Sequence, residues 1–314
     1  MNYEIRHITS YGYEYDVSLS HHVAHLTPRE TLGQHCVEHR LEAVPRMSTH
    51  STHVDHFGNL TNFLTVEGPH RQLGIVAWSR VELFPPERLM PESSAPWETI
   101  RDLHGSDSPN APMESAEFVF GSPLAPSRAD LAEYARPAFP ATRPILAGAI
   151  DLCRQIHADF KFDGHATTVM TTVQDFFKTR RGVCQDFAQL MVACLRSLGL
   201  PARYVSGYLE TLPPPGKTKL VGSDASHAWA SLWCGDDGWA DIDPTNNVIP
   251  SDHHITTAWG RDYSDVAPVS GMLVGGGRHK LTVSVDVKRM DAPPAEGTVA
   301  EAGPSPVTQP PSPW

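Results

Sequence analysis

Residues 182–201 read GVCQDFAQLMVACLRSLGLP, and they carry the strongest helix signal in the chain. Apolar side chains recur here at the spacing of one helical face. They are Phe187, Leu190, Met191, Cys194, Leu195 and Leu198. Gly199 suits the position after a helix and Pro201 prevents its continuation. A helix over residues 183–198 is therefore predicted.

Cys184 lies in the first turn of this predicted helix, directly after Gly182 and Val183. The positive end of the helix dipole favours a thiolate at that position. A lone cysteine can equally be an inert core residue. Cys153 and Cys194 suit the inert role because each lies on an apolar helical stripe. Cys184 has a polar sequence context and is the better candidate for a nucleophile.

Two further groups follow Cys184 in the sequence. His227 begins a predicted strand over residues 227–233, and Asp243 ends another over residues 238–243. A cysteine, a histidine and an acid can together form a thiol–imidazole–carboxylate triad. Asp241 is the competing acid, since residues two apart on a strand face the same side. The tryptophans of these strands, Trp229, Trp233 and Trp239, either line a substrate groove or, as is more common, fill the core.

Four ordered motifs resemble the transglutaminase-like cysteine superfamily. They are GVCQDFA at 182–188, LRSLGLPARYVSGY at 195–208, SHAW at 226–229 and DPTNN at 243–247. More narrowly, the chain is similar to bacterial and archaeal members with an N-terminal β domain. That likeness rests on residues 3–13, LTPR at 26–29, DHFGN at 55–59 and residues 260–271.

The resemblance implies an α+β fold: an N-terminal antiparallel β domain, then a papain-like core with the cysteine helix packed on an antiparallel sheet. Cys184, His227 and Asp243 match the family nucleophile, histidine and aspartate, with Asp243 preferred to Asp241 because the family acid precedes proline. The implied activity is thiol acyl transfer through a thioester, without a cofactor.

Several features of this activity stay open in the sequence. The backbone N–H of Cys184 is expected to form half of an oxyanion hole. The second donor lies near Thr167–Thr168 or at Gln185, and the candidate substrate contacts are Gln185, Thr168 and Trp229. Water as acceptor gives a protease or amidase, and an amine gives a crosslinking transglutaminase. Hydrolysis is favoured because no calcium-ligand pattern is visible. A non-catalytic binding module, or a structural partner that docks through the β domain, is the alternative.

The predicted organisation has four parts: a β domain over residues 1–88, an irregular linker over 89–126, the catalytic core with C-terminal strands over 127–290, and a tail over 291–314. Strands are predicted at 3–13, 33–44, 60–66, 73–83, 202–208 and 281–287, and helices at 97–103, 127–135, from 144 onward and at 171–178. The tail holds 7 prolines in 24 residues and is expected to be disordered.

Composition excludes several classes of protein. The net charge of −11 argues against nucleic-acid binding. No apolar run is long enough for a membrane span, and residues 1–9 do not resemble a secretory signal. Five dispersed cysteines favour a reducing cytoplasm over a disulfide scaffold. His50, His53 and His56 suggest a metal clip, but a strand would point the first two apart, so no metal is predicted. The expected partner is a peptide or protein substrate, and the oligomeric state is left open.

Overall fold

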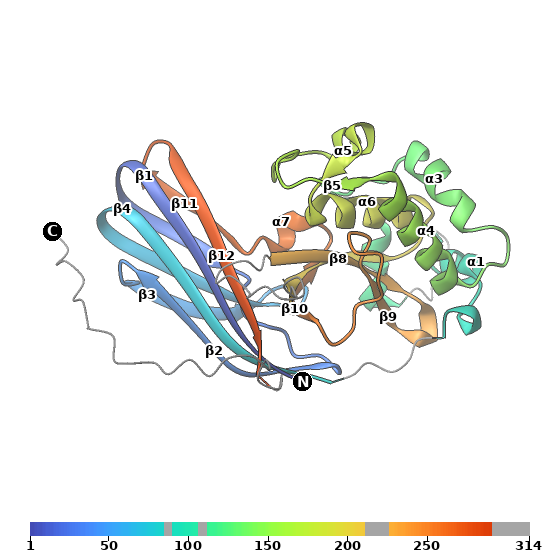
Figure 1. Cartoon of the computed structure of the whole chain (residues 1–314), viewed down its shortest axis with the longest axis horizontal. Helices are drawn as coiled ribbons and strands as arrows, with labels where there is room; N and C mark the ends of the chain where they lie inside the picture. Colours follow the sequence, from blue (N-terminus) through green and yellow to red (C-terminus); the bar gives the residue numbers. More distant parts are fainter. Residues whose placement is uncertain (85–89, 106–111, 211–225, 291–314) are drawn as a thin grey trace, which may run out of the picture.

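The computed structural model describes residues 1–84, 90–105, 112–210 and 226–290. The described chain forms two lobes, a strongly bent β sheet and a mixed lobe in which helices cover a smaller sheet (Figure 1). The predicted α+β fold, with mainly antiparallel sheets, is therefore confirmed. The tail predicted over residues 291–314 lies outside the described residues.

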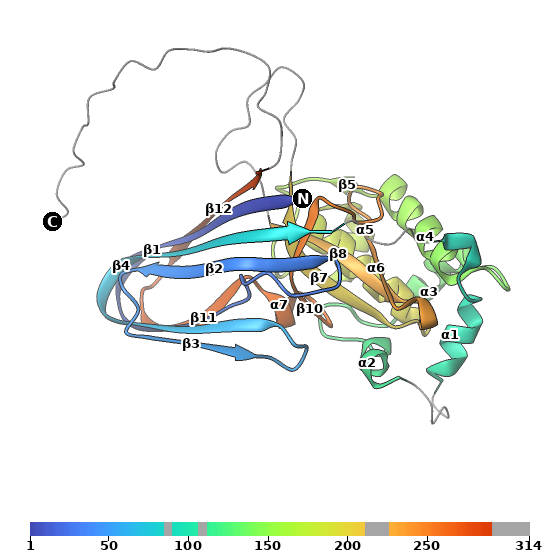
Figure 2. The same ribbon diagram turned by 90° about the horizontal axis from the view of Figure 1, so that it is seen from below.

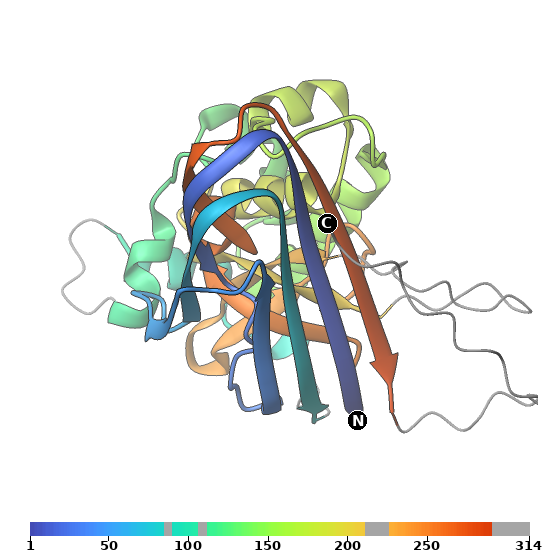
Figure 3. The same ribbon diagram turned by 90° about the vertical axis from the view of Figure 1, so that its left-hand side faces the viewer.

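Two very long strands, β1 (Asn2–Ala24) and β4 (Leu60–Leu83), form the centre of the first sheet. β2 (Gln34–Val44) and β3 (Thr49–Val54) pair with β4 on its other edge. The sequence predicts two separate strands, over residues 60–66 and 73–83, within what the structure shows as the single strand β4. β1 stays paired with both halves across a register shift after Gly12, so the ladder bends there without ending (Figure 3).

The C-terminal strands belong to this first sheet and not to the core with which the sequence grouped them. β11 (Val269–Gly275) and β12 (His279–Arg289) both pair with β1. Figure 2 shows β12 beside β1 at the edge of the sheet, and the pairings place β11 and β12 on the side of β1 that faces away from β4. The physical reason is that β1 would otherwise present an unpaired edge.

The second sheet has the order β10-β7-β8-β9 and is antiparallel throughout. Its strands are β7 (Ala202–Leu209), β8 (Ser226–Trp233), β9 (Trp239–Ile242) and β10 (His254–Gly260). Helix α6 (Cys184–Ser197) packs on β7 and β8, and nearly all of its residues are buried. The predicted helix at 183–198 is thus confirmed, and its burial on both sides explains its many apolar residues.

The remaining helices and short strands belong to the mixed lobe, and several of the helices pack on α6 (Figure 1). The helices are α1 (Trp97–Leu103), α2 (Met113–Ala116), α3 (Ala129–Ala135), α4 (Ile145–Asp159), α5 (Val173–Thr179) and α7 (Tyr263–Val266). The 3-10 turns are η1 (Pro91–Ser93), η2 (Glu117–Val119), η3 (Arg136–Ala138) and η4 (Gly235–Asp237). Two short strands, β5 (Lys161–Phe162) and β6 (Arg181–Gly182), form a parallel pair. Trp97 and Ile100 of α1 are buried in the core. The described part of the predicted linker is therefore packed on the core. None of the helices in the described ranges is both long and apolar enough to cross a bilayer.

Polar side chains of the first sheet hold β10 in place. The Gln34 side chain donates to the carbonyl of Thr256 and accepts from its N–H, both at 2.8 Å. Asn59 makes the same reciprocal pair with Trp259, both at 2.9 Å. The hydroxyl of Tyr3 donates to the carbonyl of Asp252 at 2.9 Å. These bonds fix the strand whose first residue enters the candidate site.

Candidate active site

Cys184 is the first residue of α6, and the side chain of Asp186 organises this helix start. The Oδ2 of Asp186 accepts from the N–H of Val183 at 2.8 Å and from the Thr167 hydroxyl at 2.6 Å. A Cβ on residue 182 would lie 2.5 Å from that oxygen, which explains the glycine. Burial raises the pKa of Asp186, although both hydrogen bonds oppose the shift. The bond to Thr167 also ties the 163–172 segment to the helix start.

His227, at the beginning of β8, lies between a thiol and a carboxylate. Its Nε2 is 2.7 Å from Oδ2 of Asp243, and its side chain is also hydrogen-bonded to Cys184. Because Nε2 is engaged by the acid, Nδ1 is the ring nitrogen left for the sulfur. Cys184 is half-buried, and its Sγ lies 3.9 Å from the carbonyl oxygen of Ser226. The structure thus brings together the three residues that the sequence proposed as a triad.

Asp243 is fully buried, and its carboxylate oxygens accept hydrogen bonds from four neighbouring residues of the described chain. Oδ1 accepts from the N–H groups of Thr245 and Asn246, at 2.9 and 3.2 Å. Oδ2 accepts from His227, from the Asn246 amide at 2.8 Å and from Nε2 of His254 at 3.1 Å. Sequence reasoning missed His254 and Asn246. Asn246 stands in the DPTNN motif, but nothing local to His254 indicates its contact.

The contacts of this site determine its charges. Burial opposes the charge of His227, but its hydrogen bonds with Asp243 and Cys184 outweigh that effect and raise its pKa to about 10. Burial also opposes the charge of Asp243, yet the bonds from His227 and His254 lower its pKa below the ordinary range. At neutral pH the site therefore holds an imidazolium beside a carboxylate, next to the sulfur.

The competing acid, Asp241, has a different partner. Its Oδ2 accepts from the indole N–H of Trp229 at 2.9 Å. Trp229 has 0% exposed surface and packs edge-to-face on His254, with ring centroids 5.2 Å apart. The sequence placed Trp229 among the substrate contacts, but the structure puts it behind the histidines as core. Trp233 is also buried, which agrees with the core alternative.

The other two predicted contacts, Gln185 and Thr168, lie near the helix start but make local bonds. The Gln185 amide donates to the carbonyl of Val169 at 3.3 Å, and the residue is buried. Thr168 is exposed, and its N–H donates to the hydroxyl of Thr171 at 2.9 Å. Both residues therefore shape the segment beside Cys184, and the Gln185 amide uses only one of its two N–H groups in the bond to Val169.

One set of potential metal ligands occurs among the described residues. It consists of His227, Asp243 and His254, whose ligand atoms lie within 4.8 Å of one another. Two imidazoles and a carboxylate suit a divalent cation such as Zn²⁺. The same atoms already satisfy one another by hydrogen bonding, so the set does not require a metal. The three histidines near the DHFGN turn are not brought together, since His50, His53 and His56 bond to Asn62, Ser51 and Glu117 respectively.

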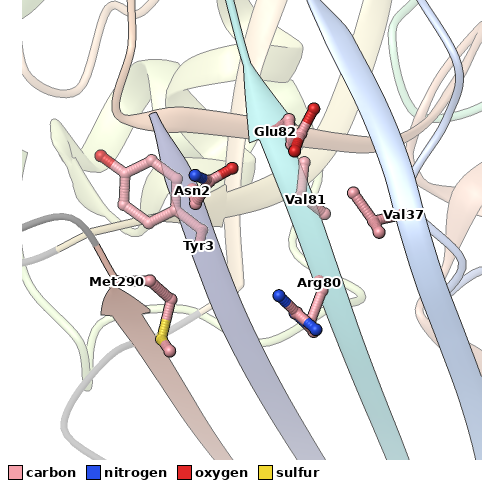
Figure 4. A pocket seen from close by; sticks show the side chains of 7 residues that line it. All are labelled: Asn2, Tyr3, Val37, Arg80, Val81, Glu82 and Met290. Carbon is pink, nitrogen blue, oxygen red and sulfur yellow. The ribbon is translucent and has the colours of Figure 1, made fainter.

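A shallow pocket lies at one end of the first sheet (Figure 4). Its lining comes from β1, β2, β4 and the residue after β12. These residues are Asn2, Tyr3, Val37, Arg80, Val81, Glu82 and Met290. No residue of the Cys184 site lines it, so it is not a candidate for thiol chemistry.

Comparison with known proteins identifies the family. Residues 3–82 match the model of the bacterial transglutaminase-like N-terminal region, and residues 133–244 match that of the transglutaminase-like superfamily. An uncharacterized protein of Mycobacterium tuberculosis is 40% identical over 295 residues, which cover 91% of this chain and 92% of that protein. The chain belongs to the transglutaminase-like superfamily.

Two further relatives place this transglutaminase-like protein in context. A solved structure from Cytophaga hutchinsonii, provisionally described as a cysteine protease, has a TM-score of 0.73 at 21% identity and covers 93% of this chain and 92% of that one. It shares the fold. A protein-glutamine gamma-glutamyltransferase of Pseudomonas aeruginosa is 44% identical over 80 residues, which are 25% of this chain and 12% of that protein. The family and fold predicted from the sequence motifs are thereby confirmed.

Proposed function

We propose that this protein is a thiol-dependent hydrolase of amide or peptide bonds, with Cys184 as nucleophile, His227 as acid and base, and Asp243 as the orienting carboxylate. One observation carries the proposal: His227 is hydrogen-bonded both to Cys184 and to a buried acid. That arrangement prepares a thiolate and an imidazolium side by side.

The reaction would proceed in two halves. The Cys184 thiolate attacks the substrate carbonyl carbon, a C–S bond forms, and His227 gives its Nδ1 proton to the leaving nitrogen as the C–N bond breaks. His227 then takes a proton from water, whose oxygen attacks the thioester; the C–S bond breaks and releases a carboxylic acid and the Cys184 thiolate, which leaves His227 protonated as at the start. The N–H groups at the start of α6 have no partner within the helix, and that of Cys184 is the proposed donor to the oxyanion.

Amine transfer is the second candidate. It uses the same thioester but an amine attacks in place of water, so the product is a new amide bond. The relative named protein-glutamine gamma-glutamyltransferase, 44% identical over 80 residues, supports this alternative. The catalytic groups serve both outcomes equally, so the acceptor has to be found by experiment.

Mass spectrometry of a peptide library incubated with the protein, with and without a primary amine, separates these functions. Hydrolysis gives cleavage or deamidation in both conditions, whereas transfer adds the mass of the amine. A Cys184→Ala variant is the control for contaminating enzymes. If neither change occurs, and iodoacetamide labels Cys184 no faster than the other cysteines, the protein is a non-catalytic module and the proposal fails.

A further inference from the structure

The carboxylate of Asp243 serves a second imidazole that the triad scheme does not use. His254 is the first residue of β10, and its Nε2 lies 3.1 Å from Oδ2 of Asp243. The same oxygen receives Nε2 of His227 at 2.7 Å. The His254 side chain is only 6% exposed, so this contact is shielded from water. One buried oxygen therefore divides its negative charge between two rings.

The surroundings of His254 indicate its protonation. A bond to the carboxylate requires the proton on Nε2. Its Nδ1 is buried and has no hydrogen-bond partner among the described residues. His254 thus donates to Asp243 through Nε2, and its ring centroid lies 5.9 Å from that of His227.

When one carboxylate oxygen accepts several hydrogen bonds, it attracts the proton of each donor less strongly than it would attract the proton of a single donor. Asp243 Oδ2 accepts from His227, His254 and the Asn246 amide. Each additional donor stabilises the carboxylate and reduces the charge that acts on the His227 proton. A catalytic imidazolium has to be stable enough to form and acidic enough to protonate the leaving nitrogen. The second imidazole is placed to adjust that balance.

We propose that His254 is a positioning residue that fixes the Asp243 carboxylate toward His227 and shares its charge, which keeps His227 able to release its proton. The role of His227 as the acid rests on the proposed function, but the effect of His254 on the Asp243–His227 bond does not. Trp229, packed edge-to-face on His254, holds this ring in place from the other side.

Further titratable groups lie on the elements that pack around His227, Asp243 and His254. They are Cys184 on α6, Cys153 on α4, Asp241 on β9, Glu210 after β7, and Asp252 and His253 before β10. His253 adjoins His254 in the chain, but its ring is bonded to Glu210 at 3.2 Å and pairs with Asp252. It therefore offers a matched control.

The test measures the proton in the Asp243–His227 bond by its downfield ¹H NMR signal, which needs no substrate. His254→Leu removes a competing donor, so the remaining bond should strengthen and the signal should shift further downfield. His254→Gln retains an amide donor, and His253→Gln leaves the site untouched, so both should stay close to the unmodified protein. The rate of Cys184 alkylation by iodoacetamide should remain within about twofold in all three variants, because none of them changes the contact between Cys184 and His227.

Two results would overturn the role of His254. An unchanged signal in His254→Leu would show that it shares no charge with His227. Loss of the signal in both His254 variants, together with slower Cys184 alkylation, would show that it only supports the fold. Failure of the proposed function is distinguishable, since it would appear as absent peptide turnover in the unmodified protein with the NMR result intact.

Discussion

Replacing Asp243 with asparagine tests how the site uses its buried acid. From the described residues the carboxylate accepts five hydrogen bonds, three on Oδ2 and two on Oδ1. An asparagine has the same shape but only one oxygen, and its NH₂ group would face N–H donors in either orientation. The neutral His227 ring is then expected to carry its proton on Nδ1, toward the sulfur, and to accept a hydrogen bond from the new side-chain amide at Nε2. The base that accepts the thiol proton would be lost.

The expected loss can be bounded from the His227 charge. The rise in its pKa from 6.5 to about 10 corresponds to about 5 kcal/mol favouring the imidazolium. Asp243 shares this effect with Cys184, so its removal should cost less than the whole. We expect turnover of a peptide found in the library screen to fall between about a hundredfold and a thousandfold, with the fold retained.

Asp241→Asn is the matched control, since Asp241 lies on β9, two residues before Asp243. Asp241 accepts the indole N–H of Trp229, and an asparagine oxygen can still accept it. Its turnover should stay within about threefold of the unmodified protein. Steady-state kinetics and a thermal melt of both variants give the comparison. A larger loss from Asp241→Asn than from Asp243→Asn would refute the assignment of the acid.

Three further outcomes are expected. Burial raises the pKa of Cys36 to about 11 and of Cys153 to about 12, so iodoacetamide at pH 6.5 should label Cys184 first, as peptide mapping would show; equal labelling of the cysteines would contradict this. Gly207→Ala should lower the thermal midpoint by several degrees and reduce activity, because a Cβ would lie 2.1 Å from the backbone oxygen of Ile255; an unchanged melt would contradict the close packing of β7 on β10. Burial lowers the pKa of His22 to about 4, so between pH 6.5 and 4 this histidine is protonated in the unfolded chain but not in the folded one. The thermal midpoint should therefore fall as the pH drops through this range. A His22→Leu variant should show a smaller fall of the midpoint with pH, and an identical fall would exclude His22 as a cause.

Local patterns explain which parts of the fold could be predicted. The helix predicted over residues 183–198 has a clear apolar face and a helix breaker at its end. The observed helix α6 differs from the predicted bounds by one residue at each end. The strand over 281–287 alternates strictly, and it lies within β12. Its sheet could not be predicted, because pairing with β1 joins residues at opposite ends of the chain. Periodicity identifies a strand but not its partner.

The site divides in the same way. Cys184, His227 and Asp243 stand in recognisable motifs, so the sequence could propose them together. His254 could not be found, because it begins a strand that the sequence did not predict and reaches Asp243 only through the order of the second sheet. The sequence left two alternatives for Trp229, because a strand tryptophan looks the same in sequence whether it faces a groove or the core. In the folded chain it fills the space over Gly207.

The return of the chain to β1 has a consequence during synthesis. A ribosome releases β1 and β4 early, whereas β11 and β12 emerge only after the whole core has been made. Until then the nascent chain carries a long strand with one open edge, which other strands can join by mistake. We expect newly made chains that stop before Val269 to depend on chaperones and to aggregate, even where their core has already folded.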